Sequence, residues 1–213
     1  MIMRSPFRNK KKREAYERKD IKKHLRKQGV VFRKDNVELK RIKLPAAIEK
    51  HVEKKVGKKV DDDFIHVYSY GPKKGSAFRL KKRKNKKWDG SGSCVLYESP
   101  AGVESEDIAG GVIMVPQAVL KDKEARDALL SNEVAAIIAA KKFSESKNKK
   151  DVYSDKVPKL ANEAEESYLK KKYKSNRKKA REKAKKLFHN PSNWGETQQK
   201  AIDWLPFFRR KRR

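Results

Sequence analysis

Apolar and polar positions follow a helical period in two segments of the chain. In the first segment, Ile48, Val52 and Val56 stand at i, i+4 and i+8, so their side chains share one face of a helix. Pro45 suits a first helical turn, and Gly57 suits the residue that follows the last turn. The pattern predicts an amphipathic helix between these two residues, with one face against a core.

The second segment begins after Asp122, whose side chain can cap a helix N-terminus. Leu130, Val134, Ile137 and Ile138 fall on one side of the helix that follows. The small alanines between them allow another element to approach closely. The sequence therefore predicts that this helix is buried in the core.

Residues 9–28 can also be helical, but with a much weaker apolar stripe. The segment has four apolar positions, which are Ala15, Tyr16, Ile21 and Leu25. A stripe this narrow is not expected to fold on a core by itself.

One long helix is expected over residues 159–188. Its first part carries Leu160, Ala164 and Leu169, whereas from residue 170 onward it is almost entirely cationic. We expect that a core cannot hold this cationic part.

Aromatic and β-branched residues mark the strands. Residues 61–71 form such a run and lead into the turn sequence GPKKG, after which residues 76–84 are extended, so a hairpin is predicted. Residues 94–99 and 110–117 predict two further strands. The expected fold class is α+β, with a small, mostly antiparallel sheet packed with two or three helices and flanked by basic helical or extended arms.

Charge is unevenly distributed along the 213 residues, which carry a net charge of +30. Residues 1–60 have 22 basic and 7 acidic residues, and residues 168–213 have 17 and 3. Between them, residues 61–100 have 9 and 5, and residues 101–167 have 10 and 13. A near-neutral middle between two basic ends is expected of a folded body that places basic arms on a polyanion.

This distribution predicts three parts. Residues 1–43 are expected to form a basic N-terminal arm and residues 44–169 an α+β body. Residues 170–213 are expected to form a basic helix followed by an aromatic and basic tail.

Four runs rich in lysine and arginine indicate phosphate binding. Lysine-dominated clusters neutralise phosphates without reading bases, and no module that reads DNA or RNA bases is recognisable. Four such runs also exceed what a solvated surface requires. The expected nucleic-acid contacts are Lys10, Lys11, Lys12, Arg13, Lys81, Lys82, Arg83, Lys84, Lys170, Lys171, Lys172, Arg177, Lys178, Lys179, Arg181, Arg209, Arg210, Arg212 and Arg213.

The C-terminal tail places large aromatic side chains beside these cations. Trp204, Phe207 and Phe208 are expected to anchor in a groove of a partner chain or of the body itself. A membrane interface also suits aromatic and basic residues. The stretch is short, however, and the charge is spread over the whole chain, so a protein partner is favoured over a membrane.

The predicted core helix contains the frame of a zinc-peptidase signature. Glu133 stands where H-E-x-x-H has its glutamate, but Asn132 and Ala136 replace the two histidines. A strand with a Gly-Gly pair precedes this helix, and a later helix carries NEAEES at residues 162–167. The order of elements over residues 93–170 resembles that of gluzincin-type HExxH metallopeptidases.

The resemblance implies a metallopeptidase-like scaffold in which a glutamate of the later helix, Glu163, would complete the site. Zinc needs three good protein ligands, and asparagine and alanine supply neither imidazole nor thiolate, so no peptidase chemistry is expected. The other interpretation is an alanine-rich core helix whose Asn-Glu pair is coincidental.

No catalytic set, metal site or cofactor site is expected elsewhere. Cys94 is the single cysteine, and the four histidines are scattered along the sequence. The glycine-containing turns lack the G-K-[ST] of a phosphate loop. The three aspartates at 61–63 point in different directions, which indicates a turn. The protein is expected not to be an enzyme.

These observations favour a non-enzymatic structural protein of a large nucleic-acid-containing particle, with arms that contact phosphates and neighbouring subunits. A virion and a ribosome-type particle both fit; a phage-like particle is slightly favoured, because the chain resembles no ribosomal family. The alternatives are a degenerate metallopeptidase-like binding scaffold and a sequence-nonspecific nucleic-acid-binding accessory factor. Without a secretory signal or a run of roughly 20 apolar residues, the chain is expected inside a cell or an assembled particle.

Overall fold

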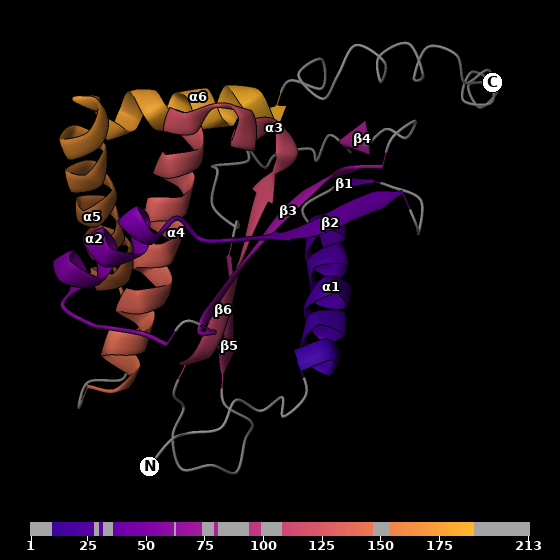
Figure 1. The fold of residues 1–213 in the computed structure, drawn as a ribbon, viewed down its shortest axis with the longest axis horizontal. Helices are drawn as coiled ribbons and strands as arrows, with labels where there is room; N and C mark the ends of the chain where they lie inside the picture. The colour runs from indigo at the N-terminus through magenta and orange to yellow at the C-terminus, as the bar shows by residue number, and fades with distance from the viewer. Residues whose placement is uncertain are drawn as a thin grey trace.

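A computed structural model gives the fold of the chain (Figure 1). It describes residues 10–27, 30–31, 36–61, 63–73, 79–80, 94–98, 108–146 and 154–189. The residues described form a sheet with helices on both of its faces. The expected α+β class is confirmed.

The sheet has four strands in the order β2-β3-β6-β5. Their bounds are Val37–Ile42 for β2, Ile65–Pro72 for β3, Cys94–Glu98 for β5 and Ile108–Pro116 for β6. The central pair, β3 and β6, is parallel, whereas both outer pairs are antiparallel. The strands predicted around β5 and β6 are confirmed, and the sheet is mostly antiparallel as expected.

The predicted hairpin is wrong. β3 pairs with the preceding strand β2, and β4 (Arg79–Leu80) pairs with β1 (Val30–Val31) in a separate two-stranded sheet. The strand β2 was not predicted, although Val37 and Leu39 are buried and alternate with exposed residues. β3 is buried along almost its whole length, so it needs a strand on each side and a cover on each face.

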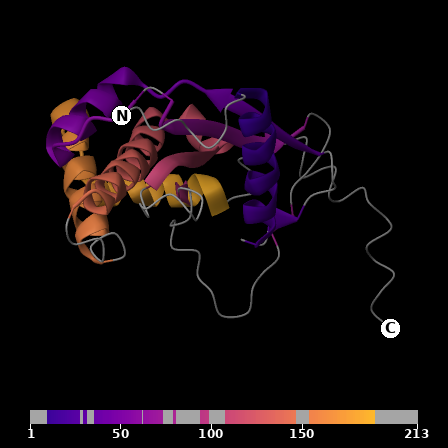
Figure 2. The same cartoon turned by 90° about the horizontal axis from the view of Figure 1, so that it is seen from below.

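Helices cover the two faces differently. Figures 1 and 2 both show α1 (Lys10–Lys27) on one side of the sheet, and α2, α4 and α5 on the other. Alternate residues of β3 divide accordingly. Val67 belongs to the main hydrophobic core, whereas His66 and Tyr68 contact α1.

The helix α4 (Lys123–Ser144) forms the centre of the core, as predicted. Asp122 caps it by accepting a hydrogen bond from the backbone N–H of Ala125 at 2.9 Å. Ile137 and Ile138 are 0% exposed. A Cβ added to Gly111 of β6 would lie 2.6 Å from Ile137 Cδ1, so the glycine lets the helix approach the sheet closely.

The helix α2 (Ala46–Val56) also forms as predicted. Ile48 and Val52 are 0% exposed, and Val56 is 1% exposed. Gly57 ends the helix with φ 72°, a left-handed conformation in which glycine has no steric penalty.

The helix α1 packs on the sheet although its apolar stripe is as narrow as the sequence indicated. Ile21 and Leu25 are buried at 1% and 0% exposure, and Glu17 between the helix and the sheet is also 0% exposed. A satisfied polar contact extends the narrow apolar stripe, so the helix can be held on the sheet. Both α1 and β2 come from the segment that was expected to be an arm.

The expected long helix is two helices, α5 (Lys156–Tyr173) and α6 (Arg177–His189). The chain turns at Lys174, which has φ 53°. α6 packs back on the body, because Ala180 and Ala184 are small enough to enter the core, at 0% and 8% exposure. The expectation that a core cannot hold this cationic segment is therefore wrong. A short helix, α3 (Gln117–Lys121), precedes α4.

Candidate nucleic-acid interface

Three carboxylates are completely buried beside the lysine- and arginine-rich helices. Glu17 lies on α1, Asp127 on α4 and Glu165 on α5, and each is 0% exposed. A buried carboxylate is costly unless cations and hydrogen-bond donors surround it. Each of the three has cationic partners, and these contacts decide how the basic helices are oriented.

Glu17 ties α1 to β3. Its carboxylate accepts hydrogen bonds from the Tyr68 hydroxyl at 2.8 Å and from Arg13 Nε at 2.9 Å, and Oε2 lies 2.9 Å from His66 Nδ1. Burial raises the pKa of Glu17, but the hydrogen bonds with His66 and Tyr68 outweigh burial and hold the pKa below its usual value. The ionised carboxylate therefore holds the helix on the sheet.

Two arginines add further contacts between α1 and β2. Arg18 donates a hydrogen bond to the backbone carbonyl of Leu39 at 2.6 Å. Arg41 of β2 pairs with Glu14 of α1 at 3.2 Å and with Asp63 at 3.5 Å. The helix is thus fixed to two neighbouring strands.

Glu165 ties α6 to α5 and α4. Arg177 Nε and Arg181 Nε both lie 3.0 Å from its carboxylate, and Asn132 Nδ2 donates to it at 2.9 Å. Asn162 accepts from Arg177 at 2.6 Å and from Asn132 at 3.1 Å. Burial raises the pKa of Glu165 above its usual value in spite of the attraction of the two arginines.

Asp127 joins α4 to the end of α5. It accepts hydrogen bonds from Lys172 Nζ at 2.5 Å and from the Tyr173 hydroxyl at 2.7 Å, and it also pairs with Arg126. Burial raises its pKa, but the hydrogen bonds of Lys172, Tyr173 and Arg126 outweigh burial and lower it. One turn earlier, Glu124 contacts two residues of the α5–α6 region, Ser175 and Lys183.

The inward acids leave the outer faces of α1 and α6 cationic. On α6, the exposed residues include Lys178, Lys179 and Lys186, and the exposed acid is Glu182. On α1, the exposed charged side chains within residues 11–26 are all basic: Lys11, Lys12, Lys19, Lys23 and Arg26. The exposed charged side chains of both helices are therefore mainly cationic.

The predicted contact residues divide into two groups. Arg13, Lys172, Arg177 and Arg181 form ion pairs with the buried acids. The second group consists of exposed lysines on α1, α5 and α6: Lys11, Lys12, Lys170, Lys171, Lys178 and Lys179.

The remaining predicted contacts fall outside the described residues. They are the side chain of Lys10, together with Lys81, Lys82, Arg83, Lys84, Trp204, Phe207, Phe208, Arg209, Arg210, Arg212 and Arg213.

Sequence reasoning did not select Lys19, Lys23 and Arg26, although a signal for them exists. They lie opposite Ile21 and Leu25 on the helical period. The narrow apolar stripe that argued against packing thus also identifies the outward face of α1.

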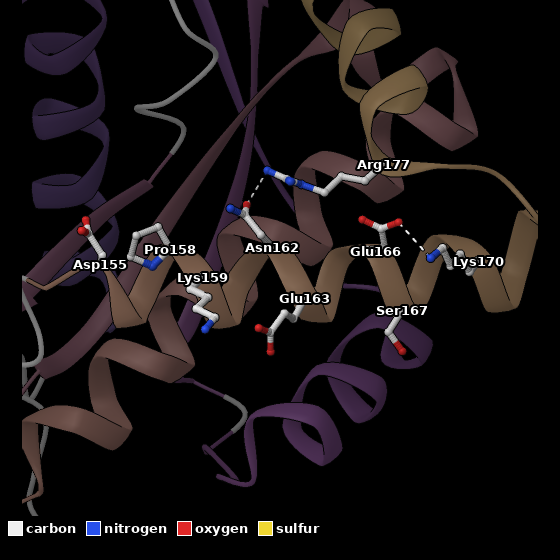
Figure 3. Close-up of a pocket in the computed structure, with 9 residues that line it drawn as sticks. All are labelled: Asp155, Pro158, Lys159, Asn162, Glu163, Glu166, Ser167, Lys170 and Arg177. Carbon is white, nitrogen blue, oxygen red and sulfur yellow. Dashed lines mark hydrogen bonds and ion pairs between the residues drawn. The ribbon is translucent and has the colours of Figure 1, made fainter.

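An open pocket of about 850 Å³ runs along α5 beside the Glu165 network (Figure 3). Asn162 and Arg177 border it, and Arg177 reaches from α6 toward Asn162. Both acidic and basic residues line the pocket, and some of them form ion pairs. Glu166 and Lys170, for example, lie 3.1 Å apart. A pocket lined by both acidic and basic side chains does not select an anion, and its lining residues indicate neither a ligand nor a reaction.

The zinc-peptidase frame contains a hydrogen-bonded network where a metal would need ligands. Asn132, in the position of the first histidine, binds Asn162 and Glu165, and Glu133 is buried at 6% exposure. Within the part of the chain that the structure describes, no group of three or more His, Cys, Asp and Glu side chains could hold a metal ion. The same residues contain no helix long and apolar enough to cross a membrane.

Comparison with known proteins gives no relative. No family model, curated protein or solved structure matches the chain. The case for a function therefore rests on the charged surfaces and the networks that orient them.

Proposed function

We propose that this chain is a non-enzymatic structural protein of a nucleic-acid-containing particle of virion or ribosome type. The outward faces of α1 and α6 bind the phosphate backbone. The near-neutral body packs against neighbouring protein subunits. The phosphate contacts hold the chain in place and do not read sequence.

One observation carries the proposal: the acids beside the basic helices turn inward. Glu17 and Glu165 are buried at 0% exposure and pair with cations of α1 and α6. A solvated, highly charged surface would gain from mixing both signs, whereas here the acids of α1 are removed from its outer face, and α6 keeps one exposed acid, Glu182, among its lysines. Together with the net charge of +30, this arrangement favours a polyanionic partner.

The experiment that tests the proposal reverses two charges on α6 in the full chain. The double variant Lys178→Glu/Lys179→Glu should bind a nucleic acid of mixed sequence at least about tenfold more weakly, because two phosphate contacts become repulsive. Fluorescence anisotropy gives the affinity, and circular dichroism checks that the fold is retained.

A matched control is available on α2. Lys54→Glu/Lys55→Glu makes the same change of charge at two adjacent exposed helical positions. The helix α2 has three lysines and two acids, Glu49 and Glu53, whereas α6 has seven basic residues and one acid, Glu182. The control should therefore lose less affinity than the α6 variant. An equal loss in both variants would mean that only total charge matters, and that α6 is no specific interface.

The particle itself is tested by sedimentation. The native protein should sediment with a nucleic-acid-containing particle, and nuclease treatment should release it. Sedimentation as a free chain that nuclease does not change would contradict the structural role and favour the accessory-factor interpretation.

A second candidate is a metallopeptidase-like domain kept as a binding scaffold. It is favoured by the order β6, α4, α5 and by the contact of Asn132 with Asn162 and Glu165 across the two helices. Equilibrium dialysis of the full chain against zinc separates the candidates. Stoichiometric zinc binding would support the second, whereas the first predicts none.

A further inference from the structure

The outward face of α1 carries an aromatic side chain among its cations. At 100° per residue, Lys12, Tyr16, Lys19, Lys23 and Arg26 lie within one narrow stripe of the helix, and all five are exposed. The opposite side of the helix holds the buried contacts with the sheet. The cations and the ring therefore share the face of α1 opposite its contacts with the sheet.

Tyr16 differs from the other tyrosines whose exposure the structure describes. The relative exposure of Tyr16 is 48%. Among the residues that the structure describes, no other large hydrophobic side chain is exposed. Tyr68, Tyr70 and Tyr168 are buried at 0%, 4% and 4%. An exposed ring between lysines is the combination that single-stranded nucleic acids need, because the cations hold phosphates and the ring stacks on an unpaired base.

We propose that the outward stripe of α1 is a binding site for single-stranded nucleic acid, in which Tyr16 stacks on a base while the flanking cations hold the backbone. This inference rests on the proposed function and names the form of nucleic acid that this face takes. Duplex is a poorer ligand for the stripe, because its bases are already stacked on one another.

The size of the stripe fits a short single strand. Lys12 and Arg26 are 14 residues apart, which is about 21 Å along a helix. At about 3.4 Å per stacked nucleotide, this length covers roughly six nucleotides. That number lies within the site sizes of about 4–16 nucleotides found for single-strand-binding domains.

The stripe is also held in place before any ligand binds. The Glu17 network and the hydrogen bond from Arg18 to Leu39 fix α1 on the sheet. Binding therefore does not have to order the helix, and less affinity is lost to conformational entropy.

The test compares Tyr16 variants of the full chain. The probes are a labelled 20-nucleotide oligothymidylate and a mixed-sequence duplex of the same length, measured by anisotropy at one salt concentration. Tyr16→Ala should weaken binding of the single strand about tenfold, the effect of losing one base stack, while Tyr16→Phe should bind like the unaltered protein. Duplex affinity should change less than twofold in both variants.

Three controls make the outcome decisive. Circular dichroism confirms the fold of each variant. Photocrosslinking with bromodeoxyuridine in the oligonucleotide should label the peptide that contains Tyr16. Vesicles containing anionic lipid should bind equally well before and after the change at Tyr16.

Two results would overturn the inference while the proposed function stands: an unchanged single-strand affinity in Tyr16→Ala, or an equal loss for single strand and duplex. Loss of vesicle binding in Tyr16→Ala, with unchanged single-strand affinity, would also overturn it and point to a lipid surface. Failure of the proposed function looks different, because the unaltered protein would then bind neither nucleic acid or would not sediment with a nucleic-acid-containing particle.

Discussion

At the scale of single residues, the buried carboxylates determine which way the charges of this protein face. Glu165 receives two arginines that would otherwise extend into solvent, and Glu17 does the same for Arg13. Arg13 pairs with Glu17 within α1, but the other partners of Glu17 lie on β3 and the arginines that pair with Glu165 lie on α6, and the sequence does not show these contacts. The inward pairing could therefore not be predicted, whereas the apolar face of α4 could.

Removing the Glu165 carboxylate should loosen α6. Glu165→Ala removes the acceptor that Arg177, Arg181 and Asn132 share, and a loss of about 1–3 kcal/mol in the free energy of unfolding is expected, because the Asn132 amide is left buried without this partner. Urea unfolding followed by circular dichroism measures it. Glu163→Ala, on an exposed position of the same helix, should change stability by less than about 0.5 kcal/mol. Equal effects would contradict the role of the network.

Glu17 should make stability depend on pH in the acid range. Its pKa lies below the usual value of 4.5 in the folded chain, so its contribution is present above pH 4.5 and is lost as the pH falls through the folded pKa. Thermal unfolding between pH 7 and pH 3 should show a smaller decrease in Glu17→Gln than in the unaltered protein. Parallel pH profiles for the two proteins would rule out this contribution.

At the scale of elements, the break between α5 and α6 allows the basic helix to fold back. Lys174 adopts φ 53°, where glycine is favoured over residues with a Cβ. Lys174→Gly should therefore raise the free energy of unfolding by up to about 1 kcal/mol. Lys171→Gly, inside α5, should lower it by about 0.5–1 kcal/mol. A destabilising effect of Lys174→Gly would contradict a strained turn.

Clear helical periodicity predicted α2 and α4 correctly, whereas the partner of β3 and the packing of α1 and α6 were not predicted. The helix α2 was predicted correctly because three large apolar residues, Ile48, Val52 and Val56, share one of its faces. The hairpin prediction failed because sequence proximity does not decide pairing when the strand is central and buried on both faces. α6 was misjudged because only Ala180 and Ala184 mark its inner side, and alanines give a weak signal.

At the scale of the whole molecule, counting charged residues along the sequence shows two basic ends and a near-neutral middle. Such a count does not show how the charged side chains are oriented, because a basic segment can be an extended arm or a packed helix with one cationic face. The structure shows packed helices for α1 and α6. Phosphate binding by these faces is therefore the central claim.

The measurement that tests this claim most directly is the salt dependence of nucleic-acid binding by the full chain. The logarithm of the association constant should fall linearly with the logarithm of the NaCl concentration. For four or more phosphates on a single strand, a slope of about −3 or steeper is expected. Lys178→Glu/Lys179→Glu should reduce the steepness by about 1 unit or more. A flat salt response of the unaltered protein would contradict the account.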